Sequence, residues 1–200
     1  MNQTSRAALD TDAQLMLRFK AGEVEAFEAL FSRHSAALVG FAYRFVRNRE
    51  AAEELAQEVF LRVHDAAPHY RPDAKFTTWL YRIATNICLN EVRRPRFRAG
   101  HQSLDSADDP DCRPVELADT AKPPADVLLQ RRAVSDALRK ALARLPQKQR
   151  AAFILNKYQE LSYAEVAEVL GVTEKAVKSL IHRAKEGLAS MLQPILTELL

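Results

Sequence analysis

The chain has 200 residues, a formal net charge of +3 and an isoelectric point near 8.9. That length accommodates one large domain or two small ones, and so mild a basic balance argues against a protein that coats nucleic acid along its whole surface. Two cysteines without a partner at zinc-ligand spacing exclude a disulfide scaffold and a zinc finger. No secretory signal and no apolar run of the ~20 residues that a bilayer span needs is present, so we expect a cytoplasmic protein without membrane insertion.

Apolar residues recur at helical spacing, and the alternating pattern typical of strands is absent, which predicts an all-α fold. After a tail that ends near Thr11, Asp12 can cap a first helix, which ends near Gly22. Three more helices are predicted over about 24–47, 50–66 and 76–93, separated by prolines and polar residues. The core face of the second helix is expected to comprise Phe27, Leu30, Phe31, Leu38, Phe41, Ala42 and Phe45.

The third predicted helix carries an acidic, amide-bearing face made of Glu53, Glu54, Gln57 and Glu58. Such a face repels DNA, so it is either solvated or directed at a basic protein surface. From the residues alone, the solvated alternative is favoured.

The fourth predicted helix and the loop before it combine cations with aromatic rings. Residues 71–98 hold seven basic side chains against two acidic ones, and five aromatic side chains are interleaved between 70 and 97. This combination suits single-stranded nucleic acid, whose unstacked bases lie on rings while cations neutralise the backbone. Phe76 and Trp79 are better explained as core residues, whereas Tyr70, in the loop, is favoured as a ligand contact. Asn86 can offer a donor and an acceptor to a base edge.

A change of composition follows the fourth helix. Residues 99–126 contain seven acidic side chains, two basic ones and four prolines, with few apolar residues to bury. We therefore expect a flexible or extended acidic linker there. Beyond it, one helix is predicted from about Val127 to Leu142. Another begins at Leu145–Pro146, because proline is tolerated at the first helical position.

The segment from Ser162 to Lys185 has the pattern of a helix-turn-helix. Ser162 and Glu165 have capping-box spacing, Gly171 marks a tight turn, and Thr173 can cap the second helix. A helical hairpin with a solvated charged face is the alternative, but such a face would mix both signs more evenly. After Leu188 an apolar stripe continues across Pro194, and we expect it to pack on its own domain. The open side of the second helix carries Lys175, Lys178, Ser179, His182, Arg183 and Lys185.

Three stretches, in the same order and spacing, resemble the extracytoplasmic-function (ECF) sigma factors, the small members of the bacterial sigma-70 family. They are AEELAQEVFLRV, FTTWLYRIATNICLNEVRR and LPQKQRAAFILNKYQELSYAEVAEVLGVTEKAVKSLIHRAKEGL. The resemblance implies two small helical domains, sigma region 2 over 12–98 and sigma region 4 over 126–200, joined by the linker at 99–125. It also implies that the chain directs core RNA polymerase to promoters, recognises the −35 element and melts the −10 element.

The resemblance further implies a partner for each surface. Glu54, Gln57 and Glu58 would dock on a coiled coil of the polymerase clamp, the segment near 145–158 would meet the flap, and an anti-sigma factor would regulate the chain. Relatives hold a base flipped from the non-template strand at the positions of Tyr70, Ile83 and Asn86. The implied −10 contacts are Tyr70, Arg71, Lys75, Arg82, Ile83 and Asn86. The implied −35 contacts are Thr173, Lys175, Lys178, Ser179, His182, Arg183 and Lys185.

The sequence departs from the family pattern in the recognition helix, and this bears on promoter preference. Leu180 stands where many relatives have arginine, and Lys178 and Lys185 replace common arginines. Lysine is a point charge and does not make arginine's bidentate contact to guanine.

Two other classes of protein compete with this interpretation. A stand-alone helix-turn-helix regulator would bind intact duplex without polymerase and would need no basic, aromatic block at 70–94. An enzyme is excluded, because no phosphate loop, metal cluster or nucleophile motif occurs. We accordingly predict no catalytic residues, no cofactor, no metal and no small-molecule substrate.

Overall fold

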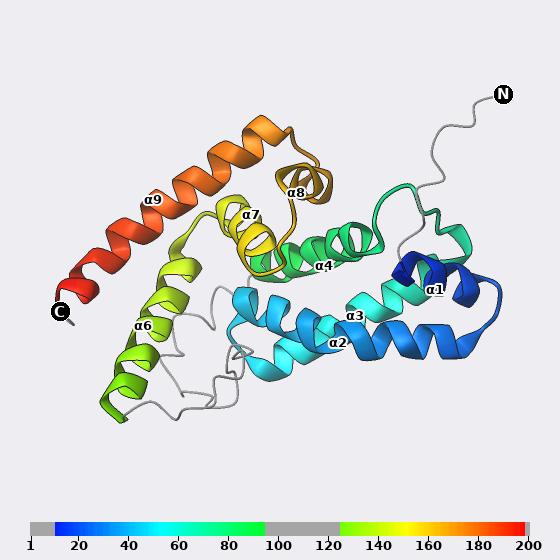
Figure 1. Ribbon diagram of the computed structural model, residues 1–200, viewed down its shortest axis with the longest axis horizontal. Coiled ribbons are helices and arrows are strands. Elements are labelled where there is room, and N and C mark those ends of the chain that lie inside the picture. The colour runs from blue at the N-terminus through cyan, green and yellow to red at the C-terminus, as the bar shows by residue number, and fades with distance from the viewer. Residues whose placement is uncertain (1–10, 95–124, 199–200) are drawn as a thin grey trace.

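The computed structural model describes residues 11–94 and 125–198, and its regular elements there are helices (Figure 1). The predicted all-α fold is therefore confirmed for these residues. The predicted tail before Thr11 and the predicted acidic linker up to residue 124 lie outside them, whereas Ala125, predicted as the last linker residue, is the first residue of a helix. The elements are α1 (Thr11–Lys20), α2 (Val24–Val46), α3 (Arg49–Ala66), η1 (Ala67–His69), α4 (Phe76–Arg93), α6 (Ala125–Arg144), α7 (Gln147–Lys157), α8 (Tyr163–Leu170) and α9 (Glu174–Glu198).

The first four helices form a bundle whose core is aromatic. α2 and α3 make an antiparallel hairpin: Arg47 turns the chain with a φ of 55°, and the Asn48 side chain caps α3 by accepting from the Ala51 amide at 2.8 Å. The prediction for Phe31 is wrong, because its side chain is 45% exposed at the edge of α2 and packs against Phe60 from outside the core. The largest fully buried side chains of the bundle include Phe41, Phe45, Phe76, Met16, Leu30, Leu38 and Leu80.

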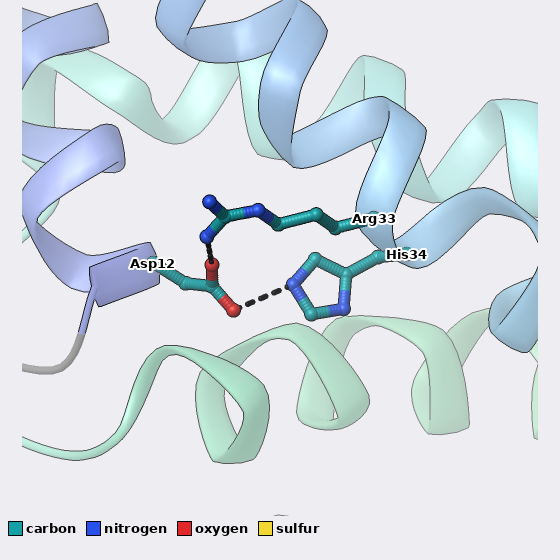
Figure 2. Close-up of polar contacts among 3 residues, drawn as sticks. All are labelled: Asp12, Arg33 and His34. Atoms are coloured by element: carbon teal, nitrogen blue, oxygen red, sulfur yellow. Dashed lines mark hydrogen bonds and ion pairs between the residues drawn. The ribbon is translucent and has the colours of Figure 1, made fainter.

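Asp12 ties α1 to α2 instead of capping α1, since the helix begins one residue earlier, at Thr11. One carboxylate oxygen accepts from the Arg33 guanidinium at 2.7 Å, and the other lies 2.8 Å from the Nε2 atom of His34 (Figure 2). The His34 ring in turn lies against Phe76, the first residue of α4. A single side chain thereby fixes the start of α1 over the α2–α4 junction.

The C-terminal half has the geometry predicted for a helix-turn-helix. Ser162 and the Glu165 carboxylate form a reciprocal capping box at the start of α8. Gly171 then adopts a left-handed φ of 63°, where a side chain would be strained. Thr173 caps α9 by accepting from the Ala176 amide at 3.2 Å. Pro146 directly precedes α7 as its cap, one position earlier than predicted.

α9 also packs along α6, which accounts for the first part of the C-terminal apolar stripe. Leu188 is buried against Leu142 and Leu145, and Met191 and Leu192 pack on the same cluster. The prediction that this stripe packs on its own domain is confirmed at these positions.

The two halves are not separate bodies. α8 packs across α4, α7 contacts α4, and α6 contacts α2 (Figure 1). One continuous apolar cluster includes Phe45 and Leu80 from the first half and Ile154, Val166 and Ile181 from the second. This packing decides which of the candidate binding faces are open.

Candidate nucleic-acid and protein interfaces

α9 presents its basic face to solvent. Its opposite face is anchored, since Val177, Ile181 and Ala184 are at most 1% exposed. This packing holds α9 firmly in place. Its polar face is therefore presented to solvent in the way that the groove-reading helix of a helix-turn-helix presents its own. All seven residues predicted to contact the −35 element are exposed: Thr173, Lys175, Lys178, Ser179, His182, Arg183 and Lys185.

Near the start of α4, the predicted −10 residues are only partly brought together. Tyr70, Arg71 and Arg82 line one cavity of about 320 Å³, together with Trp79 and with Glu168 from α8. Ile83 is half-buried and Asn86 is exposed, and neither lines this cavity. The structure thus has a cavity at one end of the predicted −10 surface. Asn86 lies outside this cavity, further along α4.

The sequence analysis favours Tyr70 as a contact for a ligand, which requires an open ring face. In the structure the ring has no open face. Tyr70 is 3% exposed, and its ring packs edge-on against Trp79, with the ring centroids 5.0 Å apart. The chain turns at the end of η1 and directs this side chain inward, beside Phe76. Trp79, interpreted from the sequence as a core residue, is half-buried and borders the cavity. Its place at the first turn of a basic helix was the signal for such a role.

Lys75, the last residue before α4, reaches across to the second half of the chain. Its ammonium lies 2.9 Å from a carboxylate oxygen of Glu165 in α8. Hydrogen bonds from Ser162 and then from Lys75 lower the pKa of Glu165 to about 2. This carboxylate therefore stays ionised well below neutral pH, and one of the predicted DNA-binding cations already has an anionic partner.

α3 presents the predicted polymerase-binding face. Glu54 and Gln57 are exposed, and Glu58 is half-buried with an ion pair of 3.6 Å to Arg62. Sequence reasoning missed Leu61 on the same face, where its side chain is 65% exposed. It follows Gln57 by one helical turn, so helical spacing could have placed it on the outward side.

Arg150 of α7 is a buried cation held by the end of another helix. It is 4% exposed and donates to the backbone carbonyls of Arg44 and Phe45, the last turn of α2. Burial lowers its pKa to about 10, which leaves it charged at neutral pH. Beside it, the Arg44 guanidinium lies 4.0 Å from the centroid of the Tyr158 ring. Helix ends expose unpaired carbonyls, and here a guanidinium from the other half of the chain satisfies them.

Two further polar contacts cross between the halves. The Tyr81 hydroxyl, whose pKa burial raises to about 12, donates to the Gln159 side chain. Arg93 Nε donates to Gln147 at 3.3 Å. These contacts extend the junction along the whole length of α4.

The described residues include no cluster of His, Cys, Asp and Glu side chains suited to a metal ion. Nor does any helix within 11–94 or 125–198 have the length and apolar character needed to cross a membrane. Cys88 is 1% exposed, and burial raises the pKa of its thiol to about 12, so it is protonated and unreactive at neutral pH.

Comparison with known proteins gives consistent matches over both halves. A family model described as sigma-70 region 2 matches residues 30–98, and one described as sigma-70, region 4, matches residues 135–188. The RNA polymerase sigma-H factor of Pseudomonas aeruginosa is 32% identical over 94% of this chain and 97% of its own length. The ECF RNA polymerase sigma factor SigM of Mycobacterium tuberculosis is 35% identical over 91% of this chain and 85% of its own.

Solved structures with a similar fold include two complexes. CnrH bound to the cytosolic domain of CnrY matches with a TM-score of 0.67 and 25% identity, over 92% of this chain and 99% of CnrH. The sigma factor RpoE with the anti-sigma factor NepR from Bartonella quintana matches with a TM-score of 0.61 and 22% identity, over 84% of this chain and 96% of that one. The second likeness concerns the fold alone.

Proposed function

Because this chain belongs to the extracytoplasmic-function sigma factors of the sigma-70 family, we propose that its two halves divide promoter recognition between them. As a sigma factor it is a non-enzymatic initiation factor. Residues 12–98 would act as region 2 and melt the −10 element, and residues 126–200 would act as region 4 and bind the −35 element. The linker at 99–125, of which the structure describes only Ala125, would follow the RNA exit path, where its acidic side chains would mimic RNA.

The −35 proposal rests on the open basic face of α9. A helix anchored by Val177 and Ile181 can enter a major groove without rearrangement, and its cations then meet phosphates and base edges. Lys178, Ser179 and Arg183 are the residues we expect to contact bases or phosphates most directly. Thr173, Lys175, His182 and Lys185 lie around them on the exposed side of the helix.

The −10 proposal rests on the cavity at the start of α4 and on the cations around it. A flipped base costs a few kcal/mol of unstacking, so the protein has to return that energy through stacking and hydrogen bonds. The cavity of about 320 Å³ lies at the small end of the roughly 300–1,000 Å³ typical of ligand sites. Arg71, Lys75 and Arg82 would neutralise the strand, with Tyr70, Ile83 and Asn86 as the proposed base contacts.

The polymerase proposal uses the exposed face of α3 and part of α7. Glu54, Gln57 and Glu58 would bind the clamp coiled coil, and the segment 145–158 would bind the flap. Much of α7 is buried against its own chain, so its outward residues, such as Lys148 and Lys157, are the ones accessible to the flap. We also propose an anti-sigma factor as regulator, supported by the complexes of CnrH with CnrY and of RpoE with NepR. Core polymerase and promoter DNA would place the protein in the cytoplasm.

One observation carries the proposal: a single chain combines an exposed recognition helix with an acidic, DNA-repelling face on α3. The test is competition between the purified chain and a labelled primary sigma factor for core bacterial RNA polymerase. Gln57→Ala should weaken competition, whereas Glu28→Gln, an exposed change on α2, should compete like the wild type. A folded chain that binds duplex DNA by itself and never competes would instead identify a stand-alone regulator.

A further inference from the structure

We propose that α1 positions the loop that forms the −10 cavity, and that His34 and Lys20 are the positioning residues through which it acts. The loop is the segment 70–75 between η1 and α4, and four of its residues line the cavity. Neither His34 nor Lys20 lines it, so neither is placed to contact a base there. The inference rests on the proposed role of this cavity at the −10 element.

The end of the loop that enters α4 is held through three packed rings. Asp12 Oδ2 lies 2.8 Å from Nε2 of His34, and the His34 ring packs on that of Phe76 with the centroids 5.5 Å apart (Figure 2 shows the first contact). The buried Phe76 ring lies 5.7 Å from that of Trp79, which lines the cavity. Because packed rings have preferred orientations and interiors leave little free space, a shift of one ring displaces the next. A contact at the start of α1 therefore reaches the cavity wall.

The first turn of α4 depends on this packing because it has no side-chain cap. Lys75, the residue before α4, makes no capping hydrogen bond with its side chain, in contrast to Asn48 before α3 and Ser162 before α8. A local cap therefore does not fix where α4 begins. Phe76 is the first residue of the helix, so the packing of its ring determines the position of this turn. Trp79 follows about one turn later and takes its position from the same turn.

The other end of the loop is held by Lys20, the last residue of α1. Its ammonium donates to the backbone carbonyl of Tyr70 at 3.0 Å, at the point where the chain leaves η1. The ring of the same tyrosine packs on Trp79 and lines the cavity. Asp12 and Lys20 lie near opposite ends of one helix of 10 residues. Because a short helix is a rigid element, α1 keeps the two ends of the loop at a constant separation.

Asp12 determines the orientation of the His34 ring. A carboxylate only accepts, so the contact requires a proton on Nε2 of His34. The side chains of His34 and Asp12 are 14% and 20% exposed, so solvent competes little for this contact. The other oxygen of Asp12 accepts from Arg33, and the carboxylate is therefore fixed through both oxygens (Figure 2). Removing the contact would let the ring rotate on Phe76 while the apolar core stays intact.

The chain's single tryptophan, Trp79, reports directly on the cavity wall. His34→Phe keeps a ring on Phe76 but removes the bond to Asp12. In the full-length chain it should change both the emission of Trp79 and its quenching by acrylamide, under conditions where circular dichroism shows the variant fully folded. Arg33→Met removes the other partner of Asp12 and is the matched control, which should emit like the wild type. Unchanged emission and quenching in His34→Phe would overturn the inference.

A double-mutant cycle tests whether Asp12 and His34 act as a pair. Asp12→Ala and His34→Phe remove the same bond, so the double variant should be quenched to the same extent as either single variant. Additive changes would show that the two side chains act independently and would contradict the route through the rings.

Lys20 provides a second, independent variant. Lys20→Met keeps the apolar stem but removes the donor to the Tyr70 carbonyl, so it should also alter the emission of Trp79. Arg18→Met is the matched control, because it removes an exposed cation of the same helix whose partner is Glu23. Equal emission of the two variants would show that Lys20 does not position the loop.

The effect on strand opening is measured in the holoenzyme. Duplex DNA that the wild-type holoenzyme selects from a randomised library is the probe, and the reactivity of unpaired thymines with permanganate measures opening. His34→Phe should lower the equilibrium constant for opening about two- to tenfold, the range that one net hydrogen bond represents. Competition for core polymerase and retention of the duplex should not change, since the surfaces proposed for them lie on α3 and α9. Equal losses of core binding and of opening would indicate general destabilisation and would contradict a positioning role.

These results are distinct from failure of the proposed function. If the wild type does not compete for core polymerase, the sigma proposal fails, whereas the Trp79 measurements on the free chain still decide whether α1 positions the loop. If the wild type competes and opens its selected DNA, but the His34 and Lys20 variants match it in emission and in opening, then the sigma proposal stands and the positioning role of α1 is wrong.

Discussion

The two surfaces proposed to bind DNA in this sigma factor are built from similar residues but differ in how open they are. On α9, the side chains of Lys178 and Arg183 are exposed over a buried apolar face. At the start of α4, Lys75 is engaged by Glu165, and Glu168 lines the cavity beside Arg82. The difference shows that a motif specifies which side chains are able to bind DNA, whereas the packing of the rest of the chain determines whether they are accessible.

The largest effect is expected from removing Arg150, the buried cation between the two halves. Arg150→Ala leaves two carbonyls at the end of α2 without their donor and should cost about 1.5–3 kcal/mol, the range for hydrogen bonds to a charged group. We expect calorimetry to show a lower melting temperature and separate unfolding transitions for the two halves. Arg144→Ala, at the exposed end of α6, is the matched control and should unfold like the wild type. Cooperative unfolding of Arg150→Ala at the wild-type temperature would show that Arg150 couples nothing.

Removing a recognition cation should affect only the open face. Arg183→Ala should weaken binding of the holoenzyme to promoter DNA by about 1–3 kcal/mol if the side chain reads a base. Because Arg183 is exposed, its loss should leave the melting temperature unchanged. Lys140→Ala, an exposed cation on α6, provides the control for net charge. Equal losses of promoter affinity in the two variants would mean that Arg183 contributes only general charge.

The turn between α8 and α9 should be sensitive to backbone conformation alone. Gly171 has a φ of 63°, and a β-carbon there would meet no atom within 4 Å. Gly171→Ala should therefore cost about 1 kcal/mol through strain without a clash, as measured by chemical denaturation. Gly40→Ala, within α2, should instead be neutral or stabilising, because its new methyl would meet only the flexible end of Arg44. A neutral result at Gly171 would show that the turn relaxes.

Lowering the pH should weaken the contact between Glu165 and Lys75. The effect should be smallest near neutral pH, where Glu165 is ionised. The Glu165 pKa is lowered from 4.5 to about 2 by Ser162 and Lys75. Its contribution to stability is therefore complete above about pH 4.5 and is lost as the pH falls towards 2. Glu165→Gln should flatten this part of the stability-against-pH curve, measured by denaturation from pH 6 down to about 2. An identical curve for the variant and the wild type would exclude Glu165 as its source.

The helix-turn-helix was predictable because its determinants are local. The Ser162–Glu165 capping box, the Gly171 turn and the Thr173 cap all act over a few residues, and each has the predicted geometry. Bounds of the helices followed from spacing and prolines for the same reason. Which residues of α9 read DNA stays a prediction.

The environment of α4 was not predictable, because distant residues create it. Nothing near Lys75 in the sequence indicates a carboxylate 90 positions later, and the partners of Arg150 lie more than 100 residues away. The inward turn of Tyr70 depends on its packing against Phe76 and Trp79. Phe31 fits the apolar spacing of α2, yet its side chain is exposed although its ring contacts Phe60 of α3.

The most direct test measures the distance between the halves in solution. Spin labels at Ser32→Cys in α2 and Ser190→Cys in α9 are exposed, and Cys112→Ser would remove the other thiol; the buried, protonated Cys88 should not react. We predict a single distance between the two labels in the free chain and a longer one once core polymerase is bound. A single unchanged distance in a holoenzyme that still opens promoters would contradict the account.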